Sequence, residues 1–159
     1  MGFLKRLTDW FRADTANDEE ATVQRVIDGD SVRLTDGREV RYIGVDANEL
    51  GSDGPWAQAA KAANIRLVQG KRVRLEREVS ETDRYGRLLR HVYVGDRWVN
   101  GELVGGGLAR ARLIAPDTQR GAELVKLQEA AQRRRRGMWR TRVWWRFWER
   151  GGKMTNGEQ

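Results

Sequence analysis

Three short stretches of this 159-residue chain carry acids and arginines at spacings that suit phosphodiester cleavage. They are IDGDSV at residues 27–32, VRYIGVDANE at residues 40–49 and TDRYGR at residues 82–87. Cleavage of a phosphodiester needs a hard cation on carboxylate oxygens, a base for water, and guanidinium groups to receive the charge that builds on phosphorus. Because the three stretches together supply all of these groups, they predict one metal-dependent enzyme site.

Each stretch taken alone also has an ordinary structural interpretation. The Asp28-Gly29-Asp30 sequence is typical of a hairpin turn. Asp83 and the arginines of TDRYGR are consistent with an exposed ion-pair cluster, and Glu49 with a loop acid. The occurrence of all three motifs in one order favours the enzyme site.

The order and spacing of these motifs resemble the staphylococcal nuclease family, the calcium-dependent thermonucleases, over residues 21–139. The resemblance rests on IDGDSV, on the pattern R-x-x-x-x-D-x-x-E that runs from Arg41 through Asp46 to Glu49, and on TDRYGR. The later segment VNGELVGGGLA and the GMW ending extend it. Several motifs in the family's order are much harder to reach by chance than one.

The resemblance implies that Asp30 and Asp46 bind Ca²⁺ through their carboxylates, with help from the backbone carbonyl of Ala47. It also implies that Glu49 orients or deprotonates the attacking water. Two carboxylates and one carbonyl leave coordination positions open for water and a phosphate oxygen, as a catalytic calcium requires. The expected cofactor is therefore Ca²⁺.

The resemblance further implies that Arg41 and Arg87 hold the reacting phosphate and that Arg84 and Tyr85 contact a neighbouring one. Arginine suits this role because its planar fork donates two hydrogen bonds to phosphate oxygens and stays charged at every relevant pH.

The chain departs from the family pattern at two places. Ala47 and Asn48 replace the threonine and proline usual between the calcium aspartate and the glutamate, which loosens the loop that aims Glu49. Arg110 and Arg112 lie in the segment where the family places base-contacting tyrosines, so they are candidates for substrate binding without base stacking.

Taken together, the resemblance implies a calcium-dependent, sugar-non-specific nuclease. It would act as a monomer on DNA and RNA by in-line attack of water and leave a 3′-phosphate and a 5′-hydroxyl. The alternative is a nucleic-acid-binding barrel without catalysis. Retention of Glu49 beside the metal acids argues against that alternative.

The elements that must position these residues follow from apolar runs and turn signals. The expected fold is α+β, with a five-stranded β-barrel of the oligonucleotide-binding (OB-fold) type, about three helices, and short helical extensions at both ends. The expected strands are residues 22–27, 31–34, 39–45, 72–77 and 87–94. The expected helices are residues 55–70, a short one within 99–108 that the three glycines end, and 119–136 capped by Thr118.

Two positions in these strands carry specific expectations. Arg41 and Asp46 have opposite parity, so a straight strand would send their side chains to opposite faces. We therefore expect regular pairing to end, or a bulge to fall, near Gly44. His91 is the only histidine, and its place in the strand-like RHVYV predicts a side chain that faces solvent or the rim rather than a catalytic base.

Composition and charge divide the chain into three parts. The absence of cysteine excludes disulfides and thiolate metal sites, so any metal must sit on oxygen. The formal net charge is +7, but residues 1–132 contain 21 basic and 21 acidic residues, so the excess lies in residues 133–159. We expect an N-terminal amphipathic segment and acidic linker (residues 1–20), the nuclease-like domain (21–139), and an Arg/Trp-rich tail (140–159).

The two ends have more than one interpretation. The aromatic and basic N-terminal segment suits docking on its own domain or weak contact with a membrane surface. The tail suits phosphate contact with base stacking, an anionic membrane, or packing on the barrel. No secretory signal or spanning segment is visible, so a cytoplasmic protein is expected, although secretion is common in the resembled family.

Overall fold

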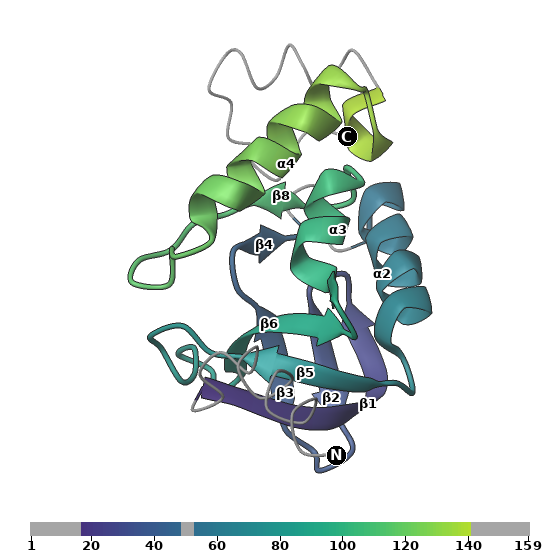
Figure 1. The fold of residues 1–159 in the computed structure, drawn as a ribbon. Coiled ribbons are helices and arrows are strands. Elements are labelled where there is room, and N and C mark those ends of the chain that lie inside the picture. The colour runs from purple at the N-terminus through teal and green to yellow at the C-terminus, as the bar shows by residue number, and fades with distance from the viewer. Residues whose placement is uncertain (1–16, 49–52, 141–159) are drawn as a thin grey trace, which may run out of the picture.

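The computed structural model describes residues 17–48 and 53–140 (Figure 1). The expected terminal helical extensions fall largely on residues 1–16 and 141–159, and the acid Glu49 falls on the gap, so these predictions lie outside the described residues. None of the helices in the described part combines the length and apolar character needed to cross a membrane.

Alternating valines and tight turns fold the first part of the chain into an antiparallel meander. It consists of β1 (Asp18–Asp28), β2 (Ser31–Leu34) and β3 (Glu39–Tyr42). β1 is long enough to serve two neighbours: residues 18–22 pair with β5 and residues 23–28 with β2. Irregularities in its register with β2 let β1 bend from its pairing with β5 to its pairing with β2.

A parallel pairing closes the barrel. β5 (Arg72–Glu76) lies antiparallel between β1 and β6 (Leu88–Val94), and β6 lies parallel to β3, with Val40 opposite Leu88. β7 (Arg97–Trp98) adds a short antiparallel partner to β6. The strands β1, β2, β3, β6 and β5 therefore form a closed ring, which confirms the five-stranded barrel of OB-fold type.

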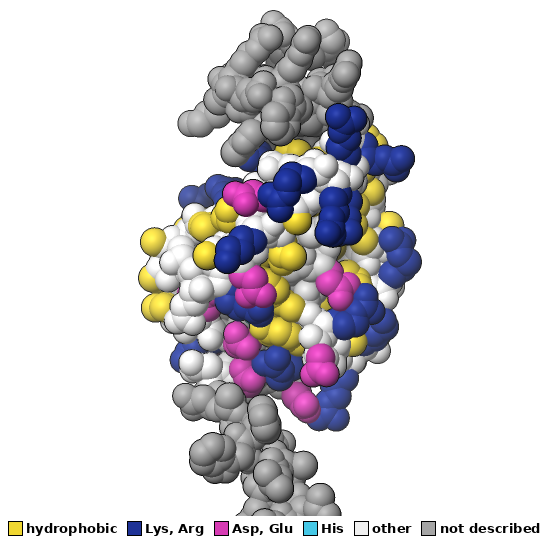
Figure 2. All heavy atoms as spheres, turned by 45° about the horizontal axis from the view of Figure 1, so that its top comes forward, with side chains coloured by type: hydrophobic (Ala, Val, Ile, Leu, Met, Phe, Trp, Pro, Cys, Tyr) yellow, Lys and Arg dark blue, Asp and Glu magenta, His cyan; other side chains and the backbone are white. Residues whose placement is uncertain are grey.

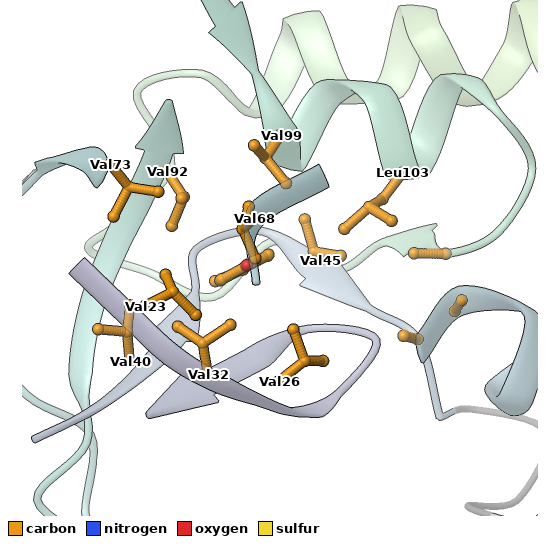
Figure 3. Close-up of a cluster of buried hydrophobic side chains, with 14 of the residues drawn as sticks. Val23, Val26, Val32, Val40, Val45, Val68, Val73, Val92, Val99 and Leu103 are labelled. Carbon is orange, nitrogen blue, oxygen red and sulfur yellow. The ribbon is translucent and has the colours of Figure 1, made fainter. Parts of the chain in front are cut away.

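Three helices accompany the barrel, as expected: α2 (Pro55–Val68), α3 (Val99–Gly105) and α4 (Gly121–Arg133), of which α4 lies beyond α3, away from the barrel strands (Figure 1). η2 (Gly137–Arg140) is a 3₁₀ turn beyond α4. α2 packs on β1, and α3 packs on β6 and α4. Valines of the strands meet Val68 of α2 and Leu103 of α3 in one buried core (Figure 3), where side-chain burial supplies most of the folding free energy.

The predicted start of the last helix was wrong. α4 begins at Gly121 rather than at residue 119, and the hydroxyl of Thr118 does not cap it. The carbonyl oxygen of Thr118 instead accepts a hydrogen bond from the N–H of Gly121 at 3.0 Å. Residues 118–121 therefore form a turn, and the helix starts two residues later than predicted.

The expected break near Gly44 is confirmed. β3 ends at Tyr42, Gly44 has a φ of +72°, and the chain re-forms as β4 (Val45–Asp46), which pairs with β8 (Arg110–Ala111) outside the barrel. A φ in this range is accessible to glycine at little cost. The break turns Asp46 away from the barrel ladder toward the segment that follows α3.

The predicted position of His91 was wrong. Its side chain is fully buried, where solvent or the rim was expected. Nε2 lies 2.6 Å from Oε1 of Glu78, and Nδ1 lies 3.2 Å from the indole nitrogen of Trp98. Polar partners on both ring nitrogens offset the cost of burying the imidazole.

Candidate active site

The turn between β1 and β2 is held by its first aspartate. Oδ1 of Asp28 accepts hydrogen bonds from the N–H of Asp30 at 3.1 Å and from the hydroxyl of Ser31 at 2.6 Å. A Cβ at Gly29 would lie 2.6 Å from the Cβ atoms of both Ala47 and Ala60. The turn therefore sits directly against α2 and the segment after β4, which fixes the position of Asp30.

The two predicted metal aspartates approach one another through Ala47. Asp30 is only 2% exposed, and its Oδ2 accepts the N–H of Ala47 at 2.8 Å. Asp46, 9% exposed, accepts the N–H of Asn48 on Oδ1 and lies 3.2 Å from Arg112 through Oδ2. Two buried carboxylates from distant stretches of sequence thus share one corner of the molecule.

The charge of Asp30 is unfavourable in this corner. Burial, together with the neighbouring Asp28 carboxyl, raises the pKa of Asp30 to about 7, although Arg41 opposes the rise. Burial would also raise the pKa of Asp28, but hydrogen bonds from Asp30 and Ser31 hold it below its usual value. A cation at this corner would relieve the concentration of negative charge.

Arg41 spans the break between β3 and β4. Its Nη1 donates to the carbonyl oxygen of Val45 at 2.7 Å and to that of Tyr42 at 3.1 Å, and its Nη2 lies 3.2 Å from Oδ2 of Asp30. The guanidinium therefore fastens the β4 segment and touches a candidate metal ligand at once.

Asp83 positions the second predicted guanidinium. Its Oδ1 accepts the backbone N–H groups of Tyr85 and Arg87, and its Oδ2 accepts Nε of Arg87 at 2.7 Å. The ion pair anticipated as an alternative is thus present. Burial raises the pKa of Asp83, but hydrogen bonds from Arg87 and Tyr85 outweigh it and leave this pKa below its usual value. The contact uses Nε alone, so it orients the guanidinium of Arg87 without occupying the two terminal nitrogens.

A pocket of about 520 Å³ collects most of the predicted phosphate-binding residues. Those that line it are Arg41, Arg84, Tyr85, Arg87 and Arg112. The guanidiniums of Arg84 and Arg87 lie 4.8 and 5.5 Å from the centre of the Tyr85 ring. Asp30 and Asp46 adjoin this pocket through their contacts with Arg41 and Arg112. Four arginines around one hollow suit an anionic ligand.

Arg110 is the predicted substrate-binding residue of the described part that does not line the pocket. Arg110 lies opposite Asp46 in the β4–β8 pair, half-buried, and is not part of the pocket wall. Glu49 lies outside the described residues, three positions after Asp46 in the sequence.

Comparison with known proteins shows the family of this chain. Residues 39–141 match the family described as "Staphylococcal nuclease homologue". The chain belongs to the staphylococcal nuclease family. It is 34% identical over 131 residues to the thermonuclease of Staphylococcus hyicus, covering 78% of each chain. It is 35% identical over 128 residues to that of Staphylococcus intermedius, covering 76% of each. It is also 30% identical over 129 residues to the SPbeta prophage-derived endonuclease YokF of Bacillus subtilis (strain 168), covering 76% of this chain and 44% of that protein.

The donor set of this family member fits a hard divalent cation. Asp30 and Asp46 offer carboxylate oxygens, and the backbone of Ala47 lies between them in space. Among the residues that the structure describes, no three acidic or histidine side chains are grouped as a metal shell. Oxygen donors of this kind are the ligands that hard divalent cations prefer.

Sequence reasoning missed two residues that shape this corner. Nδ2 of Asn48 lies 3.3 Å from Oδ2 of Asp28, so this side chain ties the segment after β4 to the β1–β2 turn where the family has proline. Asn64 of α2 donates to the carbonyl oxygen of Asp28 at 3.0 Å and accepts the hydroxyl of Tyr42. The D-G-D-S sequence signals the turn, but nothing local signals these long-range partners.

Proposed function

We propose that the protein is a hydrolytic endonuclease that cleaves the phosphodiester bonds of DNA and RNA with Ca²⁺ as its cofactor. The meeting of two buried aspartates beside an arginine-lined pocket is the observation that carries this proposal. The names of the related proteins, thermonuclease and endonuclease, support the same activity.

In this proposal Asp30, Asp46 and the carbonyl of Ala47 hold the cation. A bound Ca²⁺ supplies Lewis-acid polarisation of a phosphate oxygen. Asp28 and Asn48 keep the two acidic segments at a fixed separation through their own hydrogen bonds. Such rigid support matters because a misplaced ligand loses orientation that the reaction depends on.

Arg87 and Arg41 receive the charge that develops on the phosphate oxygens. Arg87 lines the pocket, and the contact of its Nε with Asp83 orders the side chain before substrate arrives. Preorganised donors of this kind stabilise the transition state without reorganisation at the moment of reaction. Arg84 and Tyr85 lie on the same wall and contact the neighbouring phosphate.

Glu49 takes the proton of the attacking water. The water oxygen bonds to phosphorus in line with the departing 5′ oxygen, the bond between phosphorus and that oxygen breaks, and the oxygen leaves as a hydroxyl after protonation. The products are a 3′-phosphate and a free 5′-hydroxyl. A carboxylate is a suitable base here because the arginines hold the phosphate in place and a bound cation would help to position the water.

The test is digestion of plasmid DNA and of RNA with Ca²⁺, with Mg²⁺ and with chelator. We expect cleavage with Ca²⁺, loss with chelator, and a loss of about 10²-fold or more in Glu49→Gln. Glu102→Gln, which changes an exposed acid of α3 paired with Arg97, is the matched control and should stay active.

Chelator-resistant cleavage would contradict the metal mechanism, and full activity of Glu49→Gln would remove that residue from it. Binding of nucleic acid without cleavage under every metal condition would favour the alternative, a non-catalytic binding barrel.

A further inference from the structure

A second basic surface lies at the far end of α4 from the pocket. Residues 133–140 contain five arginines and no acidic residue. We call this surface the arginine end; its members are Arg133, Arg134, Arg135, Arg136 and Arg140, all exposed. In Figure 2 the top of the Figure 1 view is turned toward the reader. Many Lys and Arg side chains lie in the upper part of this view, while most acidic side chains lie in its lower part.

The described part of the chain offers these charges few partners. Arg133 lies 4.0 Å from Glu129, a marginal ion pair, and Arg136 donates to the carbonyl oxygen of Gly105 at 3.2 Å. Within residues 17–48 and 53–140, Arg134, Arg135 and Arg140 have no acidic partner. Most other arginines of the described part, such as Arg38, Arg74 and Arg97, pair with carboxylates. Charge at the arginine end is thus left available for an external anion.

The backbone is strained where this surface is formed. α4 ends with the N–H of Arg136 bonded to the carbonyl oxygen of Ala131, the motif that places a left-handed residue just beyond the helix. That residue is Arg135, with a φ of +50°. It is the only non-glycine residue in the described part of the chain with a positive φ. Glycine is the favoured residue at this position because a Cβ is unfavourable there. An arginine at this position carries a backbone cost that glycine would avoid, which points to a role for its charge.

We propose that the arginine end is a second nucleic-acid contact that binds the phosphate backbone of the substrate outside the catalytic pocket. This inference rests on the proposed nuclease function. It adds contacts with phosphates of the substrate that are distant from the scissile phosphate. Arginine forks bind phosphate oxygens in pairs, and neutralised phosphates release counterions, so the contact adds affinity without sequence preference.

Nucleic acid fits this surface better than a membrane does. Interfacial membrane binding combines basic residues with apolar side chains that enter the lipid. The large exposed hydrophobic residues of the described part lie elsewhere: Ile65, Val79, Tyr85, Leu113 and Ile114. The described arginine end therefore offers charge but no large exposed apolar side chain for insertion.

The position of the arginine end predicts a dependence on substrate length. α4 has 13 residues and is about 20 Å long. It starts next to the pocket wall at Asp117 and ends at Arg133. At about 3.4 Å per nucleotide along a strand, a substrate needs roughly six nucleotides to reach both sites. Shorter substrates contact the pocket alone.

The test compares a variant with Arg134, Arg135 and Arg140 changed to Gln with a control of equal charge, in which Arg25, Arg66 and Lys71 are changed to Gln. The control residues are exposed and lie on β1, in the last turn of α2 and in the turn that follows it. Binding of a 30-nucleotide single-stranded DNA is followed by anisotropy in chelator against salt. We expect the first variant to bind roughly tenfold more weakly, with a salt slope smaller by about two, and the control to change little.

Cleavage with Ca²⁺ supplies the second readout. The arginine-end variant should raise KM on long DNA without changing kcat, and should leave the cleavage of a dinucleotide substrate unchanged. Equal effects of the two variants on DNA binding would overturn the proposal. So would an arginine-end variant that binds anionic phosphatidylserine vesicles more weakly than the wild type but binds DNA equally well. If the wild type cleaves nothing, the proposed function fails, but binding in chelator still decides the role of the arginine end.

A single substitution separates charge from fold. Arg135→Gly should raise Tm by about 3 °C because it removes the strained Cβ, and should still reduce the salt slope by about 0.7. A variant that is more stable and binds less DNA supports the proposal. One that binds DNA as well as the wild type, with an unchanged salt slope, contradicts it.

Discussion

At the scale of single residues, His91 shows how one hydrogen-bond donor fixes a protonation state. The indole N–H of Trp98 can only donate, so Nδ1 of His91 must accept, and the imidazole proton sits on Nε2, facing Glu78. A second proton on Nδ1 would face the indole proton. Burial, which outweighs the attraction of Glu78, lowers the pKa of His91. Glu78 also accepts the N–H of Gln119 at 3.0 Å, so the same cluster supports the segment behind the pocket wall.

The lowered pKa of His91 predicts a pH dependence of stability. In the unfolded chain a histidine takes up a proton near pH 6.5, while the folded protein resists it, so the free energy of unfolding falls as pH drops below about 6.5. Asp30, whose pKa is raised to about 7, contributes in the opposite direction. Denaturant unfolding of the wild type and of His91→Gln is therefore measured at pH 7.5 and 5.5. The difference in the free energy of unfolding between the two proteins isolates the contribution of the histidine. A difference that does not change with pH would contradict this account.

Trp98→Phe tests the cause directly. It removes the donor to Nδ1 but keeps an aromatic ring near Arg120, whose guanidinium lies 3.4 Å from the centre of the Trp98 ring. We expect the pKa of His91 to rise relative to the wild type. Because the chain has one histidine, an NMR titration reports on it without overlap. A wild-type imidazole that titrates near 6.5 would contradict the lowered pKa of His91.

At the scale of elements, the strands were predictable where local signals decide them. The first two turns, the valine-rich runs and the helix after Pro55 follow from residues close in sequence, and each lies near its expected place. The closure of the barrel by β3 and β6 joins residues 48 positions apart, such as Val40 and Leu88, and no local pattern encodes that pairing. The β4–β8 pair is equally non-local.

The site shows the same division. The positions of Asp30, Arg41 and Asp46 were predictable in outline because the parity conflict at Gly44 required a break in the strand. The burial of His91 was not predictable, since its partners Glu78 and Trp98 are seen only once the strands are paired. The tie between Asn48 and Asp28, which substitutes for a proline, also depends on the packing of the turn on α2.

The break at Gly44 yields a prediction with a matched control. Gly44 and Gly70 have nearly equal φ, +72° and +73°, but a Cβ at Gly44 would lie 2.4 Å from Cδ1 of Leu124, while one at Gly70 meets nothing within 4 Å. Gly70→Ala should cost about 1 kcal/mol from backbone strain alone, and Gly44→Ala roughly 1–3 kcal/mol more from overpacking. Urea unfolding of both variants measures this. Equal losses would mean that α4 does not pack tightly on the break.

At the scale of the whole molecule, the candidate metal corner joins three parts of the fold. The β1–β2 turn supplies Asp30, the segment after the barrel break supplies Asp46, and α2 holds the turn through Asn64. Arg112, directly after β8, reaches the same corner. A ligand bound here contacts segments that are distant in sequence, so its binding should stabilise the fold as a unit rather than one loop.

Binding of Ca²⁺ should therefore raise the thermal stability of the entire domain. A ligand at 100 times its Kd stabilises the native state by about 2.7 kcal/mol, which corresponds to a Tm increase of roughly 5–10 °C for a domain of this size. Asp46→Asn should remove most of that increase while costing little stability without Ca²⁺, because it replaces a buried charge by a neutral side chain of the same shape. Asp96→Asn, at an exposed turn, should keep the full increase. Scanning calorimetry with Ca²⁺ and with chelator measures both, and an equal Ca²⁺ shift in the two variants would place the cation elsewhere in the protein.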